Sequence, residues 1–158
     1  MKRLLPFILL LSACSPIRVK GDPSFLKMER LAVLAVIPGT DATCERLAES
    51  ARSNIEQGFM AAGYRIVNRS KIDPAIDDFK LRITGAVTPK TASRLGQMLG
   101  AQGLVIPSCE RIGKVDWRLK ILDVETGKIV VNSTLLGAWP GSNEGVQKWV
   151  EKIKAELK

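Results

Sequence analysis

The sequence predicts a single α/β domain in which helices cover a mixed β-sheet. Residues 31–37 form a continuous apolar run, rich in β-branched side chains, that is typical of a strand buried on both faces. Residues 42–62 carry apolar side chains about every 3.6 positions, which indicates an amphipathic helix. Residues 115–121 alternate between apolar and charged side chains, the pattern of a half-buried strand. Elements that alternate in this way build one layered α/β sandwich.

Residues 1–13 have the composition of a bacterial lipoprotein signal peptide. The segment begins with two positive side chains and continues in an apolar stretch too short to cross a bilayer as a permanent helix. Its end, Leu11-Ser12-Ala13-Cys14, resembles a lipobox, which implies that Cys14 carries diacylglycerol and palmitate chains. We therefore expect Cys14 to begin the mature chain and to attach it to a membrane. The alternative is an ordinary secretory signal with an incidental cysteine.

The residues after Cys14 predict the position of the domain. In lipoproteins of enteric-like bacteria an Asp directly after the cysteine resembles an inner-membrane retention signal, so Ser15 favours the outer membrane, facing the periplasm. The inner membrane is the alternative. Residues 14–27 are predicted as a lipid-anchored tether, because they contain two prolines and a glycine without clear periodicity. Residues 15–27 reach at most ~45 Å, and residues 28–158 are predicted as the folded domain.

The composition excludes several function classes. The chain has 24 Lys+Arg, 16 Asp+Glu and no His, and removal of the signal peptide leaves 22 basic and 16 acidic residues, a net charge of +6. The basic residues are scattered, which favours an ordinary solvated surface over binding of nucleic acid. The lack of histidine excludes Ser-His-Asp and Cys-His catalysis and histidine metal sites. With no phosphate-loop or nucleophile-elbow motif, we expect no catalytic residue, cofactor or metal ion.

Two cysteines remain after Cys14, at positions 44 and 109. They are too few for a Cys₄ zinc site, but two thiols in an oxidising compartment can form one disulfide. Cys44 lies at the start of the predicted helix after the first strand, and Cys109 lies just past the apolar strand at residues 104–106. If the two strands are parallel neighbours, both cysteines lie near the same sheet edge, which makes Cys44 and Cys109 a candidate disulfide. The alternative is two separate thiols.

The remaining segments complete the order β-α-β-α-α-β-β-β-α. Asp41 or Thr43 can cap the first helix, and Gly100 suits the end of a helix that opens at Thr88. Gly127 suits the left-handed position of a hairpin turn. In chain order the predicted segments are a strand at 64–67, helices at 72–79 and 88–100, strands at 104–106, 115–121 and 129–136, and a helix capped by Ser142.

Two tryptophans near the C-terminus predict different roles. Trp149 falls on the apolar face of the last helix, so we expect it to pack that helix onto the sheet. Trp139 lies in a loop between glycines at positions 137 and 141, and an exposed loop tryptophan is a candidate contact residue for a partner. Packing of Trp139 over the sheet edge is the alternative.

Four segments carry a family resemblance: the strand at 31–37, the segment 64–70 that closes in Arg-Ser, the helix-bearing segment 85–101 and the strand-turn-strand at 117–129. In this order they resemble the family of the curli-secretion lipoprotein CsgG, which includes FlgO-like flagellar lipoproteins and is similar in fold to LpoB. The resemblance implies a CsgG/LpoB-like α/β sandwich that acts without catalysis, as an assembly, secretion-accessory or scaffolding component. It implies other envelope proteins as partners and allows a homo-oligomer.

Two further functions follow from the same observations. The likeness to LpoB implies an activator of a peptidoglycan synthase, but such an activator has to reach from the outer membrane to an inner-membrane enzyme. Residues 15–27 are too short a tether for that distance, so this function is the alternative. An envelope hydrolase is the third hypothesis, and the sequence offers it no histidine and no nucleophile motif.

Overall fold

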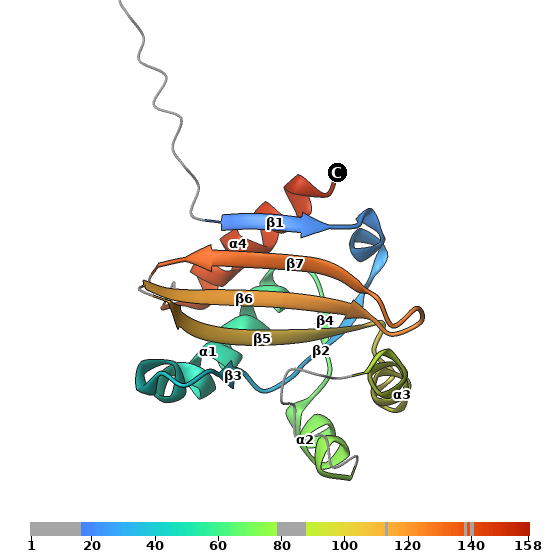
Figure 1. Cartoon of the computed structure of the whole chain (residues 1–158). Coiled ribbons are helices and arrows are strands. Elements are labelled where there is room, and N and C mark those ends of the chain that lie inside the picture. The colour runs from blue at the N-terminus through green and yellow to red at the C-terminus, as the bar shows by residue number, and fades with distance from the viewer. Residues whose placement is uncertain (1–16, 79–87, 113, 138, 140) are drawn as a thin grey trace, which may run out of the picture.

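One mixed β-sheet forms the centre of the fold, with the strand order β1-β7-β6-β5-β2-β4 and with β3 paired to β5 (Figure 1). The computed structural model describes residues 17–78, 88–112, 114–137, 139 and 141–158. β2 is parallel to β4 and β5, β3 is parallel to β5, and the other pairs are antiparallel. The strands are β1 (Ile17–Gly21), β2 (Arg30–Val33), β3 (Ile37–Pro38), β4 (Arg65–Ile66), β5 (Gly103–Ile112), β6 (Lys114–Asp123) and β7 (Ile129–Leu136).

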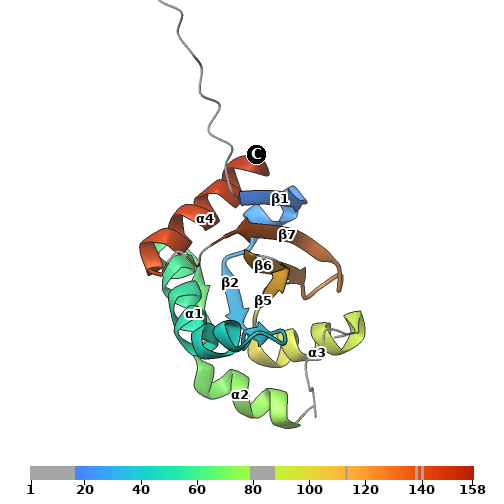
Figure 2. The ribbon, with the colours of Figure 1, turned by 60° about the vertical axis from the view of Figure 1, so that its left-hand side comes forward.

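The helices lie on both faces of this sheet but cover them unequally (Figure 2). α1 and α4 pack side by side on one face, and α2 and α3 cover the other face only at its β5–β2 end. The predicted single α/β domain with helices over a mixed sheet is confirmed in the described residues. The helices are α1 (Ala42–Ala61), α2 (Arg69–Asp78), α3 (Pro89–Leu99), α4 (Asn143–Glu156) and the 3₁₀ helix η1 (Pro23–Lys27).

The larger core lies between the sheet and the pair α1–α4. Trp117, Leu119 and Ile121 alternate along β6 with charged residues and are buried there, as their period of two predicts. Trp149 of α4 is 1% exposed and donates its Nε1–H to Ser133 Oγ of β7 at 2.8 Å. The expected packing of Trp149 onto the sheet is therefore confirmed, and a buried hydrogen bond holds α4 in place.

The prediction of a tether over residues 14–27 is wrong from residue 17 onward. β1 pairs with β7 along its whole length, and η1 buries Phe25 completely, with its ring 5.4 Å from that of Tyr64. The physical reason is that the apolar side chains at 17 and 19 face the larger core while the charged side chains between them point away. Residues 17–27 therefore belong to the domain, and the signal peptide lies outside the described residues.

The apolar run at 31–37 is two strands rather than one. β2 ends at Val33 and β3 begins at Ile37, and after the Leu34 N–H, which still donates to Val105 O at 2.9 Å, the chain leaves β5 until Ile37. Pro107 of β5 lies between the two stretches that pair with β2 and β3, where its missing N–H breaks no ladder bond on that side. The proline thus lies inside a ten-residue strand, longer than the predicted 104–106.

Side-chain caps set the helix ends, with one displaced boundary. Asp41, rather than Thr43, caps α1, and Gly100 ends α3 with a left-handed φ of 60°. α2 begins at Arg69, three residues before the predicted start, and it tolerates Pro74 within its length. The predicted end of that helix at residue 79 lies outside the described residues.

Candidate functional site

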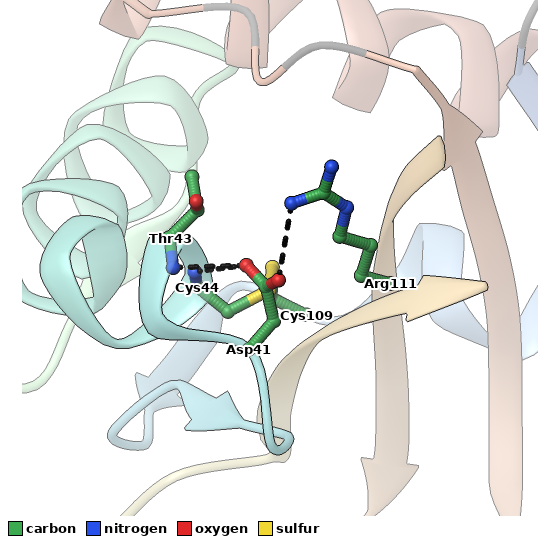
Figure 3. The surroundings of a disulfide bond; sticks show 5 residues. All are labelled: Asp41, Thr43, Cys44, Cys109 and Arg111. Carbon is green, nitrogen blue, oxygen red and sulfur yellow. Dashed lines mark hydrogen bonds and ion pairs between the residues drawn. A yellow bond between two sulfur atoms is a disulfide. The ribbon is translucent and has the colours of Figure 1, made fainter. Parts of the chain in front are cut away.

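No group of Cys, Asp or Glu in the described residues could hold a metal ion. No helix in that part of the chain is long and apolar enough to cross a bilayer. Two of the residues that the sequence singled out, Cys44 and Cys109, meet at one end of the sheet, where α1 begins beside β5 (Figure 3).

A disulfide joins Cys44 of α1 to Cys109 of β5, with the two Cα atoms 5.6 Å apart. Both cysteines are fully buried. The parallel pairing of β2 and β3 with β5 places them together, since Pro38 lies opposite Cys109 and α1 starts a few residues later. The structure thus brings together the two cysteines that the sequence predicted as a candidate pair. It does so because β2 and β5 are parallel neighbours, as that prediction assumed.

An ion pair lies beside the disulfide (Figure 3). Asp41 Oδ1 accepts hydrogen bonds from the backbone N–H groups of Thr43 and Cys44, at 2.8 and 3.3 Å, and Arg111 Nη1 lies 3.3 Å from Asp41 Oδ2. Burial alone would raise the pKa of Asp41, but these hydrogen bonds and the Arg111 charge together hold it below its usual value. The carboxylate therefore stays ionised at neutral pH and links α1 to β5 beside the disulfide.

Trp139 is half-buried and lies against Trp117, with their ring centroids 4.3 Å apart. The expectation that Trp139 is an exposed contact residue is therefore corrected, and the alternative of packing at the sheet holds. The reason is that Trp117 on β6 presents a large apolar surface that the loop covers. Both indole Nε1–H groups are buried without an acceptor in the described residues, so the aromatic contact has to offset their lost hydration.

The sequence patterns did not predict that one arginine of α1 is buried in an ion-pair cluster. Arg52 of α1 is 5% exposed and donates Nη2–H to Val33 O at 3.2 Å and to Asp73 of α2 at 2.9 Å. Glu56 lies 3.5 Å from Arg52 Nε and accepts from Arg69 at 2.8 Å, which raises the pKa of Arg69. The cluster joins α1 to α2 by paired charges, and no chemistry beyond that follows from it.

Cys14 lies outside the described residues, so its lipidation stays a prediction. Its position in the sequence nevertheless relates it to the fold, because β1 begins only three residues later. The sequence thus predicts reactive cysteines at two places: the disulfide at one end of the sheet, and Cys14 shortly before β1.

Sequence comparison finds no matching family model and no similar chain among curated proteins. Solved structures, in contrast, share the fold. A PelC dodecamer from Paraburkholderia phytofirmans superposes with a TM-score of 0.53 at 16% identity, over 89% of this chain and 96% of that one. Lipoprotein GNA1162 from Neisseria meningitidis gives 0.54 at 15% identity, over 80% and 94%.

The C-terminal domain of LpoB from Escherichia coli is a third structure of this kind. It superposes with a TM-score of 0.52 at 15% identity, over 74% of this chain and 94% of that domain. Identities this low establish the fold alone. The chain therefore has the α/β sandwich fold of the LpoB C-terminal domain and of GNA1162, as the resemblance in the sequence implied for LpoB.

Proposed function

We propose that this protein is a lipid-anchored component of the bacterial cell envelope that acts by binding other envelope proteins. The observation that carries the proposal is the lipobox at Cys14 placed directly before a folded domain that contains a disulfide. Disulfides persist in oxidising compartments such as the periplasm, so the Cys44–Cys109 bond supports export. The acyl chains on Cys14 would then hold the domain at a membrane surface.

We place the protein at the outer membrane, facing the periplasm. The support is Ser15, which differs from the Asp that resembles an inner-membrane retention signal, and the inner membrane is the alternative. A structural neighbour that is called a lipoprotein, GNA1162, agrees with an anchored protein of this fold. Membership of the CsgG-like family is also part of the proposal, and its support is the set of four segments in the sequence.

We propose a non-enzymatic role in assembly, secretion or scaffolding. The sequence supports it by lacking histidine and every nucleophile motif considered. The PelC structure of this fold is a dodecamer, which supports self-association as one way in which such a domain can act. Partners are therefore other envelope proteins or further copies of this chain, and nucleic acid is not among them.

Activation of a peptidoglycan synthase is the second candidate function, supported by the likeness to the LpoB C-terminal domain. The position of β1 argues against it. Only two residues lie between Cys14 and Ile17, so the anchor and the first strand are at most ~10 Å apart. A domain held this close to the outer membrane cannot reach an inner-membrane enzyme unless that enzyme itself extends across the periplasm.

Two experiments test the proposal. Cells that express the chain with labelled palmitate should incorporate label into the wild-type protein and none into Cys14→Ser, and the label should fractionate with the outer membrane. Labelled Cys14→Ser, or unlabelled wild type, would contradict the anchor. Cross-linking in intact cells followed by mass spectrometry then distinguishes the functions, because ladders of the chain with itself favour self-assembly and a cross-link to a synthase favours activation.

A further inference from the structure

One part of the sheet surface is left uncovered by the described helices. α1 and α4 cover one face, and α2 and α3 reach the other face only near β5 and β2, so β1, β7 and β6 present an open face toward the viewer of Figure 1. Four basic side chains lie on it: Arg18, Lys20, Arg118 and Lys120. We refer to these four residues as the basic sheet face.

The register of the strands aligns the four cations in two rows. Arg18 lies opposite Thr134, which lies opposite Arg118, and one step along the sheet the same holds for the other pair. Their direction follows from alternation, because the neighbouring apolar residues of β1 and β6 point into the larger core. Both rows therefore cross β1, β7 and β6 on the same side, with a lysine or arginine at each end.

The charge of these rows is only partly neutralised. Arg118 Nη1 lies 3.2 Å from a carboxylate oxygen of Glu110, but no ion pair in the described residues involves Arg18, Lys20 or Lys120. The two acidic residues on this side, Glu110 and Asp116, lie opposite each other at the β5–β6 end, away from β1. Positive charge is thus concentrated toward the β1 edge, where Arg18 and Lys20 are exposed.

The surface between the two rows is shallow and carries both polar and apolar atoms. Arg18, Val19, Lys20, Asn132 and Thr134 line a hollow of about 260 Å³ there. Such a surface offers an anionic group two cations and hydrogen-bonding side chains. A phosphate head group can bind there without entering a deep pocket.

The sequence places this edge near the proposed anchor. β1 begins three residues after Cys14, so acyl chains on that residue would bring Arg18 within roughly 15 Å of the attachment point. Attraction of separate cations to an anionic membrane is weak, about fivefold in partition for each Lys or Arg. Once the acyl chains hold the domain at the surface, a weak attraction of this kind is sufficient to orient it.

We propose that the basic sheet face docks on the anionic phospholipid head groups of the membrane to which Cys14 anchors the protein. The proposal rests on the proposed anchoring and adds an orientation to it: β1, β7 and β6 face the bilayer, and α1 and α4 face the periplasm. Charge complementarity and the position of Cys14 next to β1 favour a lipid surface over an acidic protein as the occupant. The helices of the larger core then remain available to protein partners.

Vesicle binding of the full chain with Cys14→Ser tests the docking without acylation. Vesicles of phosphatidylethanolamine and phosphatidylglycerol supply the anionic surface, and phosphatidylcholine vesicles measure the contribution of the apolar leader, which all variants share. The double variant Arg18→Gln/Lys20→Gln should bind the anionic vesicles roughly 25-fold more weakly. Arg118→Gln/Lys120→Gln should weaken binding in the same direction, and added salt should reduce the difference from the parent chain.

The matched control is Arg46→Gln/Lys71→Gln, which removes one arginine and one lysine that are exposed on α1 and α2 and have no ion pair in the described residues. It should change anionic binding less than fivefold, with circular dichroism unchanged in every variant. Equal losses in the control and the β1 variant, or an equal loss on phosphatidylcholine, would overturn the proposal. Unlabelled Cys14 in the palmitate experiment would overturn the anchor alone, so the two failures are distinguishable.

Discussion

The Cys44–Cys109 bond makes a quantitative prediction, because it closes a loop of known length. The two cysteines are 65 residues apart, and a cross-link over such a loop reduces the entropy of the unfolded chain by an amount worth ~4 kcal/mol at 25 °C. The variant Cys44→Ala/Cys109→Ala should lose this contribution and, since both side chains are fully buried, a further ~1 kcal/mol of packing. For a domain of this size the melting temperature should fall by roughly 15 °C.

Urea unfolding of the chain with Cys14→Ser in every variant measures this loss without mixed disulfides. The free energy of unfolding should fall in the double variant, and the dependence of that energy on urea should rise, because an uncrosslinked chain exposes more surface when it unfolds. The parent chain unfolded with a thiol reductant should match the double variant within about 1 kcal/mol.

The single variants sharpen this test. Cys44→Ala and Cys109→Ala each break the same bond, so each alone should cost nearly as much as the double variant, and the effects should not add. Small additive losses, together with identical unfolding of oxidised and reduced parent chain, would refute the argument that the cross-link stabilises the fold.

Three further changes test other contacts. Trp149→Phe removes the donor to Ser133 Oγ and should lower the free energy of unfolding by ~1–3 kcal/mol in urea. Gly96→Ala would place a Cβ 2.1 Å from a methyl group of Val124, so overpacking should cost ~1–3 kcal/mol, and adding Val124→Ala should recover part of it. Burial raises the pKa of Tyr64 from 10.0 to about 12. The stabilisation of the fold by the neutral Tyr64 side chain is therefore complete below pH 10 and is lost as the pH rises toward 12. Tyr64→Phe should reduce that alkaline loss by ~1–2 kcal/mol, after allowance for solvent screening, in unfolding measured from pH 9 to 12.

Local patterns predicted most of the helices and strands, because caps, turns and periodicity depend on residues that are only a few positions apart. The helix cap at Asp41 and the left-handed Gly100 at the end of α3 are local signals of this kind. The pairing of Cys44 with Cys109 required one step more, the assumption that the first strand and the strand at 104–106 are parallel neighbours. β2 and β5 are parallel neighbours, which is why two cysteines 65 residues apart lie together.

β1 was missed because its stability comes from a distant partner. Ile17 and Val19 alternate with charged residues, but the strand is only five residues long. A proline precedes it and it ends in a glycine, and both residues indicate irregular chain more strongly than the short alternation indicates a strand. Its partner β7 follows more than a hundred residues later, and Ser133 Oγ donates to Arg18 O across that separation at 2.9 Å. No periodicity within the first thirty residues contains that information.

The buried Arg52 was missed for a similar reason. A charged residue among apolar positions of α1 suggests a solvated side chain, because burial of a charge without a partner is costly. Here Asp73 of α2 supplies the partner, and only the folded chain brings that carboxylate within 2.9 Å of the Arg52 guanidinium.

The finding that residues 17–27 are folded, and are no tether, affects the proposed function more than the predicted fold. A flexible link of thirteen residues would let the domain explore ~45 Å from Cys14 in any orientation. With β1 folded against β7, the link shortens to ~10 Å, and one defined edge of the sheet becomes the edge nearest the anchor. A partner that binds α1 or α4 would then meet a domain whose other side is already turned toward the membrane. Under the proposed anchoring at Cys14, the short link favours the proposed assembly role at the surface of one membrane over reach across the periplasm.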